Sequence, residues 1–351
     1  SRGRLPGFAM AIARPLQLQP ILLPKVWGGE RLRAFVAEED LGEEGWPDGE
    51  PIGEVWLVCD RDERTSVIAS GPFAGRTLSG LMLSEREALL GRMAPSEKGG
   101  FPLLVKLLEA RENLSVQVHP DSVAADALGS SPKSKCWYVL DAEPGAEVFL
   151  GLAPGVDAAE FARGAVTPEV VDLLQRFRVR AGDGVDVPAS TVHSVCAGVA
   201  LLEVQNNCDT TYRIFDWDRT GLDGGPRETH VDEALRSIDY GAAATGPWPV
   251  ESGEEEGHEG APVNQHATLR DGELFQAEIL DLHAPEELAA PGEPTVLVGL
   301  TGKGRLDTGD GGSYPLTKGI TWLLPADLES ARVADACGNL RILRARTKRI
   351  R

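Results

Sequence analysis

The chain has 351 residues, of which 42% are hydrophobic and 25% are charged, and its formal net charge is −19 at pH 7. Such a composition is typical of a soluble globular protein with a core large enough for two domains. The acidity argues against a nucleic-acid partner, because such proteins usually carry a basic footprint, but a local basic pocket can still hold a small anion.

Signals for membrane insertion and secretion are not apparent. No apolar run approaches the roughly 18 residues that cross a bilayer, and the stretch SRGRLPGFAMAIARP lacks the continuous apolar core of a signal peptide. The five cysteines are odd in number and form no CxxC pair. We therefore expect reduced thiols in a cytoplasmic protein, and the sequence indicates no protein partner.

Short strands dominate the predicted elements. The 40 glycines and 24 prolines recur between short apolar runs, which favours many strands and turns. Residues 78–93 carry a partial apolar stripe and predict a helix. Residues 101–120 predict two strands joined by a polar turn at 111–113. Residues 157–177 predict two short helices, because Gly164 and Pro168 interrupt the helical pattern.

The remainder of the chain predicts two β regions. Strand patterns return at residues 178–217, and the small, acidic and turn-rich stretch 241–264 is the best linker candidate. Apolar stretches after it predict the strands of a smaller domain. We therefore expect a larger domain at 16–240 with helical insertions, a linker at 241–264, and a smaller β domain at 265–351.

An internal repeat supports two related β units. A glycine is followed after six residues by a proline, and after five more by a third residue, at Gly182, Pro188 and His193 and again at Gly319, Pro325 and Ser330. The pattern resembles the second motif of the cupin superfamily, which are double-sheet jelly rolls with a metal inside. We therefore expect a mainly β fold of two cupin-type jelly-roll units with a few short helices. Because Ser330 replaces the histidine, we expect no metal in the C-terminal unit.

A candidate metal site begins with LSVQVHPD, residues 114–121. If this stretch is a strand, Ser115, Gln117 and His119 share one face, with alternate residues about 7 Å apart at Cα. Imidazole suits Zn²⁺, and an amide oxygen can supply a harder ligand. His193, after a proline turn on another strand, is a natural third ligand. Each histidine taken alone is more simply explained as a satisfied core residue.

Six stretches, in order along the chain, resemble one family. They are LPKVWGG (23–29), IGEVW (52–56), FPLLVKLLEARENLSVQVHPD (101–121), KSKCWYVLDAEPGAEVFLGL (133–152), VPASTVHSV (187–195) and EVQNNCDTTYRIFDWDR (203–219). Together they resemble the short bacterial form of type I mannose-6-phosphate isomerase, a zinc-dependent aldose–ketose isomerase. The resemblance covers residues 16–240, which would be the catalytic domain, and is weaker beyond them.

The resemblance implies a reaction and a cofactor. A mannose-6-phosphate isomerase interconverts mannose 6-phosphate and fructose 6-phosphate by moving a proton between C1 and C2 through a cis-enediol. One zinc ion per chain would be bound by Gln117, His119 and His193. A divalent ion suits this chemistry because it polarises the sugar oxygens and stabilises the developing negative charge.

The same resemblance implies roles for five further residues. Arg213 occupies the place of the family's catalytic arginine, with Asp209 nearby as a polar partner. Lys106, Ser115 and Lys133 match positions in the family's substrate pocket, where they would hold the phosphate or hydroxyls of a small sugar phosphate. We count Lys133 and Asp209 with Arg213 among the catalytic residues, although a lysine, a carboxylate or a bound water could shuttle the proton.

One ligand of the family is missing. Its fourth ligand is the glutamate of Gly-Lys-Thr-Glu-x-Trp-Tyr, but this chain reads PKSKCWYV and has Lys135 there. At about 4 Å and an effective dielectric of about 20, an ammonium repels a divalent ion by roughly 8 kcal/mol. Lys135 could be neutral or turned away, Glu54 or Glu203 could replace the glutamate, or the site could hold no metal.

Three functions therefore stay open at this point. The first is a mannose-6-phosphate isomerase. The second is an isomerase-like cupin that binds a sugar phosphate with weak or no activity, because Lys135 replaces the ligand glutamate. The third is another cupin enzyme such as an iron oxygenase, which is disfavoured because its site requires a carboxylate ligand.

Overall fold

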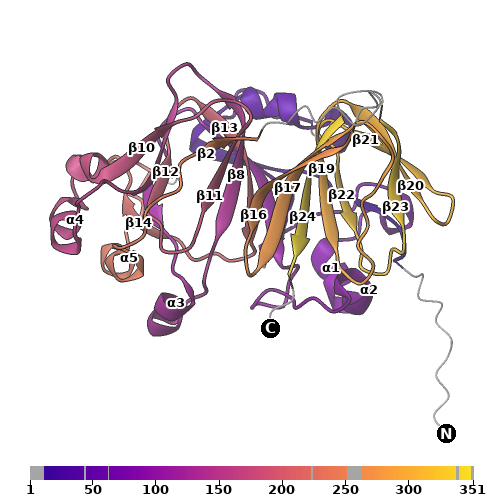
Figure 1. The fold of residues 1–351 in the computed structure, drawn as a ribbon, viewed down its shortest axis with the longest axis horizontal. Helices are drawn as coiled ribbons and strands as arrows, with labels where there is room; N and C mark the ends of the chain where they lie inside the picture. The colour runs from indigo at the N-terminus through magenta and orange to yellow at the C-terminus, as the bar shows by residue number, and fades with distance from the viewer. Residues whose placement is uncertain are drawn as a thin grey trace, which may run out of the picture.

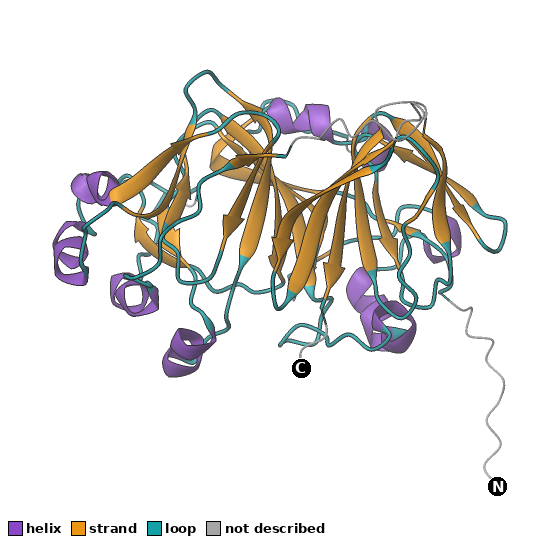
Figure 2. Ribbon diagram, in the orientation of Figure 1, coloured by secondary structure: helices purple, strands orange, loops and turns teal. Residues whose placement is uncertain are grey.

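The structure, a computed structural model, describes residues 12–42, 45–61, 63–222, 224–250, 263–336 and 340–348. It consists of two β units side by side, each made of two facing sheets (Figures 1 and 2). All the strand pairs in the described residues are antiparallel, and so are the isolated bridges. The expected mainly β fold of two jelly-roll units is confirmed.

The first unit joins a seven-stranded sheet to a five-stranded sheet. The seven-stranded sheet has the order β15 (Trp248–Pro249), β11 (Asp183–Val187), β8 (Lys135–Ala142), β13 (Val199–Asn206), β6 (Leu103–Ala110), β3 (Ile52–Val58) and β2 (Ile21–Gly29). The five-stranded sheet has the order β10 (Leu174–Arg178), β9 (Glu147–Leu152), β12 (His193–Val195), β7 (Val116–Val118) and β14 (Tyr212–Phe215).

The second unit joins a six-stranded sheet to a four-stranded sheet. The first of these has the order β1 (Leu16–Gln17), β22 (Thr321–Leu324), β19 (Thr295–Thr301), β24 (Leu340–Thr347), β17 (Phe275–Leu282) and β16 (Gln265–Asp271). The second has the order β18 (Glu286–Glu287), β23 (Ala331–Ala336), β20 (Lys303–Thr308) and β21 (Ser313–Thr317). A separate two-stranded sheet pairs β4 (Asp60–Arg61) with β5 (Arg64–Thr65).

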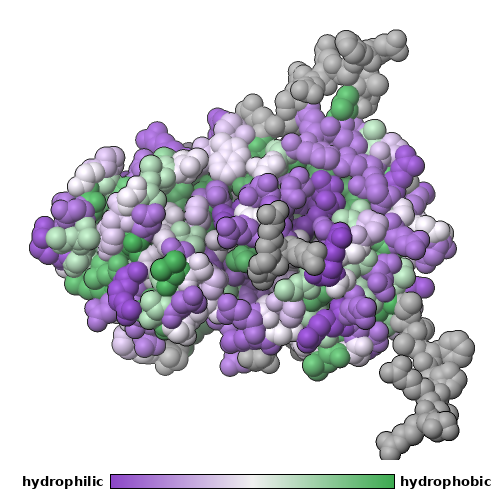
Figure 3. All heavy atoms as spheres, turned by 60° about the horizontal axis from the view of Figure 1, so that its bottom comes forward, coloured by the Kyte–Doolittle hydropathy of each residue, from purple (hydrophilic) through white to green (hydrophobic). Residues whose placement is uncertain are grey.

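Short helices cover the ends and the outer face of these sheets (Figure 2). The α-helices are α1 (Leu78–Ser84), α2 (Arg86–Leu90), α3 (Ser122–Leu128), α4 (Ala158–Gly164) and α5 (Val231–Ser237). The 3₁₀ helices are η1 (Arg31–Phe35), η2 (Glu38–Asp40), η3 (Gly71–Phe73) and η4 (Pro168–Leu173). No described helix has the length and apolar character needed to cross a membrane. On the face drawn in Figure 3, apolar residues are scattered among hydrophilic ones.

Side chains on the two faces of the seven-stranded sheet pack into different apolar clusters. One face packs against the second unit, and the other faces the interior of the first unit. On β13, Leu202 and Val204 belong to an apolar cluster that also contains Val298 and Leu343 of the six-stranded sheet. Leu201, the residue directly before Leu202, belongs to the cluster inside the first unit. Successive residues of a strand point to opposite faces. The residue after Leu202, which is Glu203, therefore faces the interior of the first unit.

The local predictions are largely confirmed. The stretch 101–120 forms β6 and β7, and 157–177 contains α4 and η4. The single helix expected at 78–93 is instead the pair α1 and α2, which meet at Glu85. The repeat is also confirmed as a structural feature: Gly182 and Gly319 have φ of 94° and 87° and precede β11 and β22. Such φ values favour glycine, which explains the glycine in both copies.

Two segments cross the expected domain boundaries. The N-terminal β1 pairs with β22, and so completes a sheet of the second unit. In the expected linker, Trp248 and Pro249 form β15 at the edge of the first unit, paired with Asp183 and Gly184. Residues 251–262 of the linker lie outside the described residues. The chain therefore ties the two units together at both ends of the larger domain.

A buried carboxyl group beside β1 gives the fold a pH-dependent contact. Gln17 Nε2 donates a 2.6 Å hydrogen bond to Asp40 Oδ1, and Asp40 is 4% exposed. Burial, together with the charge of Glu39, raises the pKa of Asp40 to about 6 from 3.8. The folded state therefore binds a proton more tightly than the unfolded state, and this contribution to stability is lost as pH rises from about 4 to about 6.

Replacing Asp40 with asparagine is expected to stabilise the protein at pH 8 and to have much less effect at pH 4. The variant removes the cost of ionising a buried carboxyl group, which is about 1–3 kcal/mol for a shift of this size. Urea unfolding of both proteins at the two pH values measures the difference. An equal effect at pH 4 and pH 8 would contradict the assignment.

Candidate active site

A row of polar and aromatic side chains crosses the inner face of the seven-stranded sheet. Trp56 on β3 lies opposite Lys106 on β6, Lys106 lies opposite Glu203 on β13, and Glu203 lies opposite Trp137 on β8. Residues that are opposite in antiparallel strands point to the same face with Cβ atoms about 4.5–5.5 Å apart. The register of four strands therefore places these side chains together inside the first unit.

Glu203 is the centre of this row. It is 1% exposed, and its carboxylate lies 3.1 Å from Lys106 Nζ and 3.0 Å from Lys135 Nζ. Trp137 Nε1 donates a 2.6 Å hydrogen bond to it. Burial alone would raise the pKa of Glu203, but the ammonium groups of Lys106, Lys135 and Lys133 outweigh it and hold the pKa far below its ordinary value. Glu203 is thus a buried, ionised counterion of the lysines.

A second carboxylate extends the row. Glu54 Oε2 lies 3.4 Å from Lys106 Nζ and accepts a 2.7 Å hydrogen bond from Trp56 Nε1. Burial opposes its ionisation, but Lys106 and Lys25 lower the pKa of Glu54 to about 2. Conversely, Glu203 and Glu54 overcome burial and raise the pKa of Lys106. Both carboxylates that could have replaced the missing ligand are therefore already paired.

A facing row lies on the five-stranded sheet. Gln117 on β7 is opposite His193 on β12 and also opposite Arg213 on β14. Gln117 Nε2 lies 3.2 Å from His193 Nε2, and Ser115 Oγ donates to Gln117 Oε1 at 3.4 Å. The ring centroids of His193 and Trp137 are 5.8 Å apart, so the two rows meet across the interior.

His119 completes the set of candidate donors. It is 1% exposed, and its ring centroid lies 4.9 Å from that of His193. Among the described residues no partner meets hydrogen-bond geometry with either ring nitrogen, although the main chain of Thr210 is close. Burial and the neighbouring Lys133 and Lys135 hold the pKa of His119 well below 6.5. The imidazole is therefore neutral, as a metal ligand must be.

The donor set fits a divalent cation held by neutral groups. Buried polar atoms without partners are rare, and a cation bound between the histidines would satisfy one of the two ring nitrogens of His119. Rotating the side-chain amide of Gln117 by a half turn exchanges its oxygen and nitrogen atoms. This flip would place Oε1 toward His193. Among the described residues no three His, Cys, Asp or Glu side chains form such a group, and the Gln117 amide is the candidate third donor beside the two histidines.

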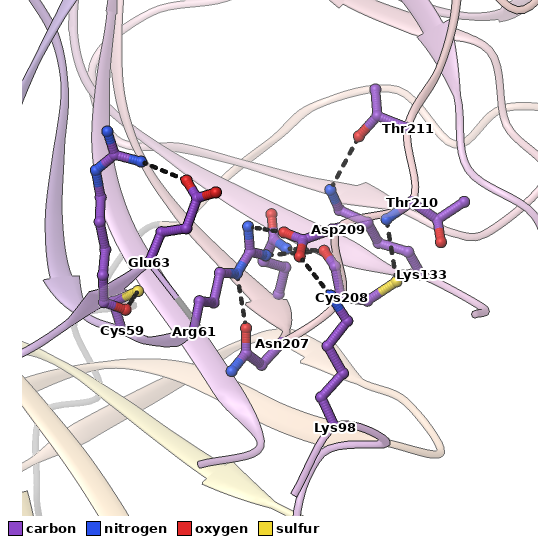
Figure 4. Close-up of polar contacts among 12 residues, drawn as sticks. Cys59, Arg61, Glu63, Lys98, Lys133, Asn207, Cys208, Asp209, Thr210 and Thr211 are labelled. Carbon is purple, nitrogen blue, oxygen red and sulfur yellow. Dashed lines mark hydrogen bonds and ion pairs between the residues drawn. The ribbon is translucent and has the colours of Figure 1, made fainter. Parts of the chain in front are cut away.

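Two buried lysines border the donors. Lys133 Nζ donates a 3.3 Å hydrogen bond to Thr211 Oγ1, which is drawn in Figure 4, and burial with Lys135 and Lys106 lowers the pKa of Lys133 to about 7. Lys135 is 4% exposed and is bound to Glu203. The pairing gives the ammonium of Lys135 a counterion. The choice among the three outcomes considered for this residue stays a prediction.

Arg213 and Asp209 do not form the expected pair. Asp209 lies on the loop after β13, where Arg61 and Lys98 bind its carboxylate (Figure 4). It lines a cavity of about 420 Å³ that contains none of the candidate metal donors. Arg213 Nη1 donates a 2.5 Å hydrogen bond to the Glu228 main-chain oxygen. The carboxylate that acts most strongly on the charge of Arg213 is that of Asp216. The pairing prediction is wrong because the loop directs Asp209 away from β14.

Sequence reasoning missed what Glu54 and Glu203 do. Both were considered only as substitute metal ligands, whereas both are counterions of lysines. A signal was present: Glu203 interrupts the apolar run VALLEV, and an ionised residue within a buried strand is nearly always paired. The partner could not be named, because Lys135 and Lys106 reach Glu203 only through the register of β8, β13 and β6.

Comparisons with known proteins point to one family. Residues 16–150 match the model of the family described as phosphomannose isomerase type I, catalytic domain. The chain is 31% identical to the mannose-6-phosphate isomerase ManA of Bacillus subtilis over 90% of this chain and 94% of that protein. It is 36% identical to the mannose-6-phosphate isomerase of Streptococcus mutans over 68% of this chain and 72% of that protein.

A solved structure agrees as well. The crystal structure of mannose 6-phosphate isomerase from Bacillus subtilis superposes with a TM-score of 0.75 at 27% identity, covering 94% of this chain and 99% of that one. The match extends through both β units, so the Bacillus subtilis structure also contains the second unit. The chain belongs to the type I phosphomannose isomerase family.

Proposed function

We propose that the protein interconverts mannose 6-phosphate and fructose 6-phosphate by moving a proton between C1 and C2 through a cis-enediol. The observation that carries the proposal is the facing of two rows, with the neutral donors Gln117, His119 and His193 on one sheet and the lysines bound to Glu203 on the other. Relatives that bear the name of this activity cover nearly the whole chain.

We further propose that Gln117, His119 and His193 hold one zinc ion. Two imidazoles and an open position for water or substrate suit Zn²⁺, and a divalent ion there would polarise the sugar oxygens. Lys135 stays out of this set because Glu203 binds its ammonium at 3.0 Å. We expect weaker metal binding than a carboxylate ligand would give, because the three donors carry no charge and the nearby lysines repel the ion.

The chain's own residues would divide the chemistry between them. The guanidinium of Arg213, opposite Gln117, is permanently charged and would stabilise the negative charge of the enediolate. Lys133, with a pKa of about 7, would take the proton from one carbon and return it to the other. Ser115 lies beside Gln117 and is suited to a sugar hydroxyl. The role of Asp209 stays a prediction.

Replacing Lys133 with glutamine is expected to lower kcat by about 10²–10⁴-fold, the usual contribution of a positioned acid or base. Glutamine keeps the length and polarity of the side chain but cannot carry the proton. A coupled assay of fructose 6-phosphate formation measures the change. Lys303, exposed on β20 of the second unit, provides the control variant Lys303→Gln, which should turn over like the wild type. An unchanged kcat in Lys133→Gln would exclude Lys133 as the proton carrier.

A second candidate function is binding of the sugar phosphate without turnover. The observation that favours it is the position of Lys135, because the loss of a carboxylate ligand weakens the hold on the ion. In that case mannose 6-phosphate would raise the melting temperature without product formation.

We also propose a cytoplasmic location. Cys59, Cys136, Cys196 and Cys208 are free thiols, as is common in a reducing compartment, and Cys337 lies outside the described residues.

A further inference from the structure

A cluster of cationic side chains surrounds the indole of Trp27 on β2. The guanidinium carbons of Arg227 and Arg219 lie 4.7 Å and 5.5 Å from the ring centroid, and Lys25 Nζ lies 5.8 Å from it. Arg213 belongs to the same cluster, because Arg227 and Arg219 both act on its charge. A chain with a net charge of −19 thus concentrates four cations beside the candidate active site.

The cluster has too few acceptors for its donors. Asp216 binds Arg219 at 2.6 Å and Arg227 at 3.2 Å. Trp27 Nε1, Arg213 Nε, and both Nε and Nη1 of Arg219 are nevertheless buried without a hydrogen-bond partner in the structure. A buried donor without a partner costs about 1–3 kcal/mol, so several together at one place indicate that a ligand supplies the acceptors.

The turn that delivers Arg219 is itself strained. Trp217 and Asp218 have φ of 60° and 53°, in the left-handed region that residues other than glycine seldom adopt. Trp217 Nε1 fixes the turn by donating a 2.8 Å hydrogen bond to the Leu114 main-chain oxygen. Strain of this kind persists where the surrounding structure holds it and is concentrated at functional sites. Here it brings Arg219 back over Trp27.

We propose that Arg219, Arg227 and the indole N–H of Trp27 bind the phosphate group of the sugar phosphate, an inference that rests on the proposed isomerase function. A phosphate monoester carries a charge of about −1.5 to −2 at pH 7 and three acceptor oxygens, which match the excess of charge and of donors. Arginine suits the task because its planar group binds two phosphate oxygens at once. The resemblance implies that Lys106, Ser115 and Lys133 hold the phosphate or the sugar hydroxyls, but Glu203 and Glu54 already bind Lys106.

The order of the residues agrees with the order of the groups along the substrate. Arg213 lies opposite Gln117 on the neighbouring strand, so it borders the candidate metal donors on one side and Arg219 and Arg227 on the other. C1 and C2, where the proton moves, lie at the end of the sugar that is remote from the phosphate. A substrate held by its phosphate at Trp27 would therefore present its reacting end to Gln117 and the histidines.

The test measures anion binding separately from catalysis. Isothermal titration with inorganic phosphate, with mannose 6-phosphate and with unphosphorylated mannose is carried out on the wild type and on Arg219→Gln, Arg227→Gln and Trp27→Phe. Arg236→Gln, an exposed arginine on α5, is the control for the loss of one positive charge. Coupled assays on the same proteins give KM and kcat, and thermal unfolding confirms that each is folded.

We expect Arg219→Gln and Arg227→Gln to weaken binding of both phosphate compounds at least tenfold and to raise KM by a similar factor, with kcat changed less than threefold. Trp27→Phe keeps an aromatic ring but loses the five-membered ring with its N–H, while both arginines remain, so a smaller loss is expected. If Arg219→Gln does not fold, because Asp216 loses a partner, Arg227→Gln and Trp27→Phe carry the test.

Two results separate this inference from the proposed function. Binding of inorganic phosphate that depends on Arg219 and Arg227 in a protein without isomerase activity would retain the anion site and reject the function. Normal phosphate binding and normal KM in the variants of an active isomerase would overturn the anion site alone.

Discussion

Replacing Glu203 with glutamine is expected to lower the free energy of unfolding by about 3–5 kcal/mol, the usual result of removing one partner from a buried ion pair. The carboxylate binds Lys106 at 3.1 Å and Lys135 at 3.0 Å, and all three side chains are shielded from water. Glutamine has nearly the same shape but no charge. Glu54 would then be the remaining carboxylate of the row, and it contacts Lys106 but not Lys135. The Lys135 ammonium would lose its counterion.

Urea unfolding at pH 7 measures this loss as a shift of the midpoint. Asp172→Asn is the matched control, because Asp172 forms an exposed pair with Arg176 at 3.3 Å. Exposed pairs contribute only about 0.3–0.5 kcal/mol when they are spaced like this one. If the two variants unfold at similar urea concentrations, Glu203 does not stabilise the lysines as described.

Replacing Lys135 with glutamate is expected to tighten zinc binding by at least about tenfold, since the change removes a positive charge beside a divalent ion and adds a carboxylate ligand. Lys135 stands where the resemblance places the family's ligand glutamate, on the strand whose Trp137 ring faces His193. Glu203 would retain Lys106 and Trp137 as partners, so the variant should remain folded. Isomerase activity at limiting zinc should rise with metal occupancy.

The affinity is measured by competition with a chromophoric chelator, and the metal content by elemental analysis after gel filtration. Lys303→Glu makes the same change of charge on an exposed side chain far from the donors and should leave the affinity unchanged. Equal zinc affinity in Lys135→Glu and the wild type would mean that the lysine has no influence on the ion.

Patterns within single strands were enough to predict much of the fold. The alternation in LSVQVHPD predicts that Ser115 and Gln117 share one face, and their side chains are indeed hydrogen-bonded. The spacing from Gly182 to His193 predicts a turn between two strands, which the structure has between β11 and β12. These predictions succeed because strand period and turn chemistry are local properties.

Contacts that depend on strand register could not be predicted. Lys135 was considered as a charge aimed at the ion, because its partner Glu203 lies on a strand that follows much later in the chain. Likewise, β1 was placed in the larger domain, although its hydrogen bonds are made to β22 near the other end of the sequence. Arg219 and Arg227 carry no distinctive spacing, and only folding brings them to Trp27. Such information resides in tertiary pairing, which a single sequence does not display.

The most direct measurement is the conversion of mannose 6-phosphate by the purified wild-type protein, assayed with its zinc content determined in the same sample. The account predicts that fructose 6-phosphate forms when zinc is supplied and that turnover falls as a chelator removes the metal. Tight binding of mannose 6-phosphate with a full complement of zinc and no product would contradict it.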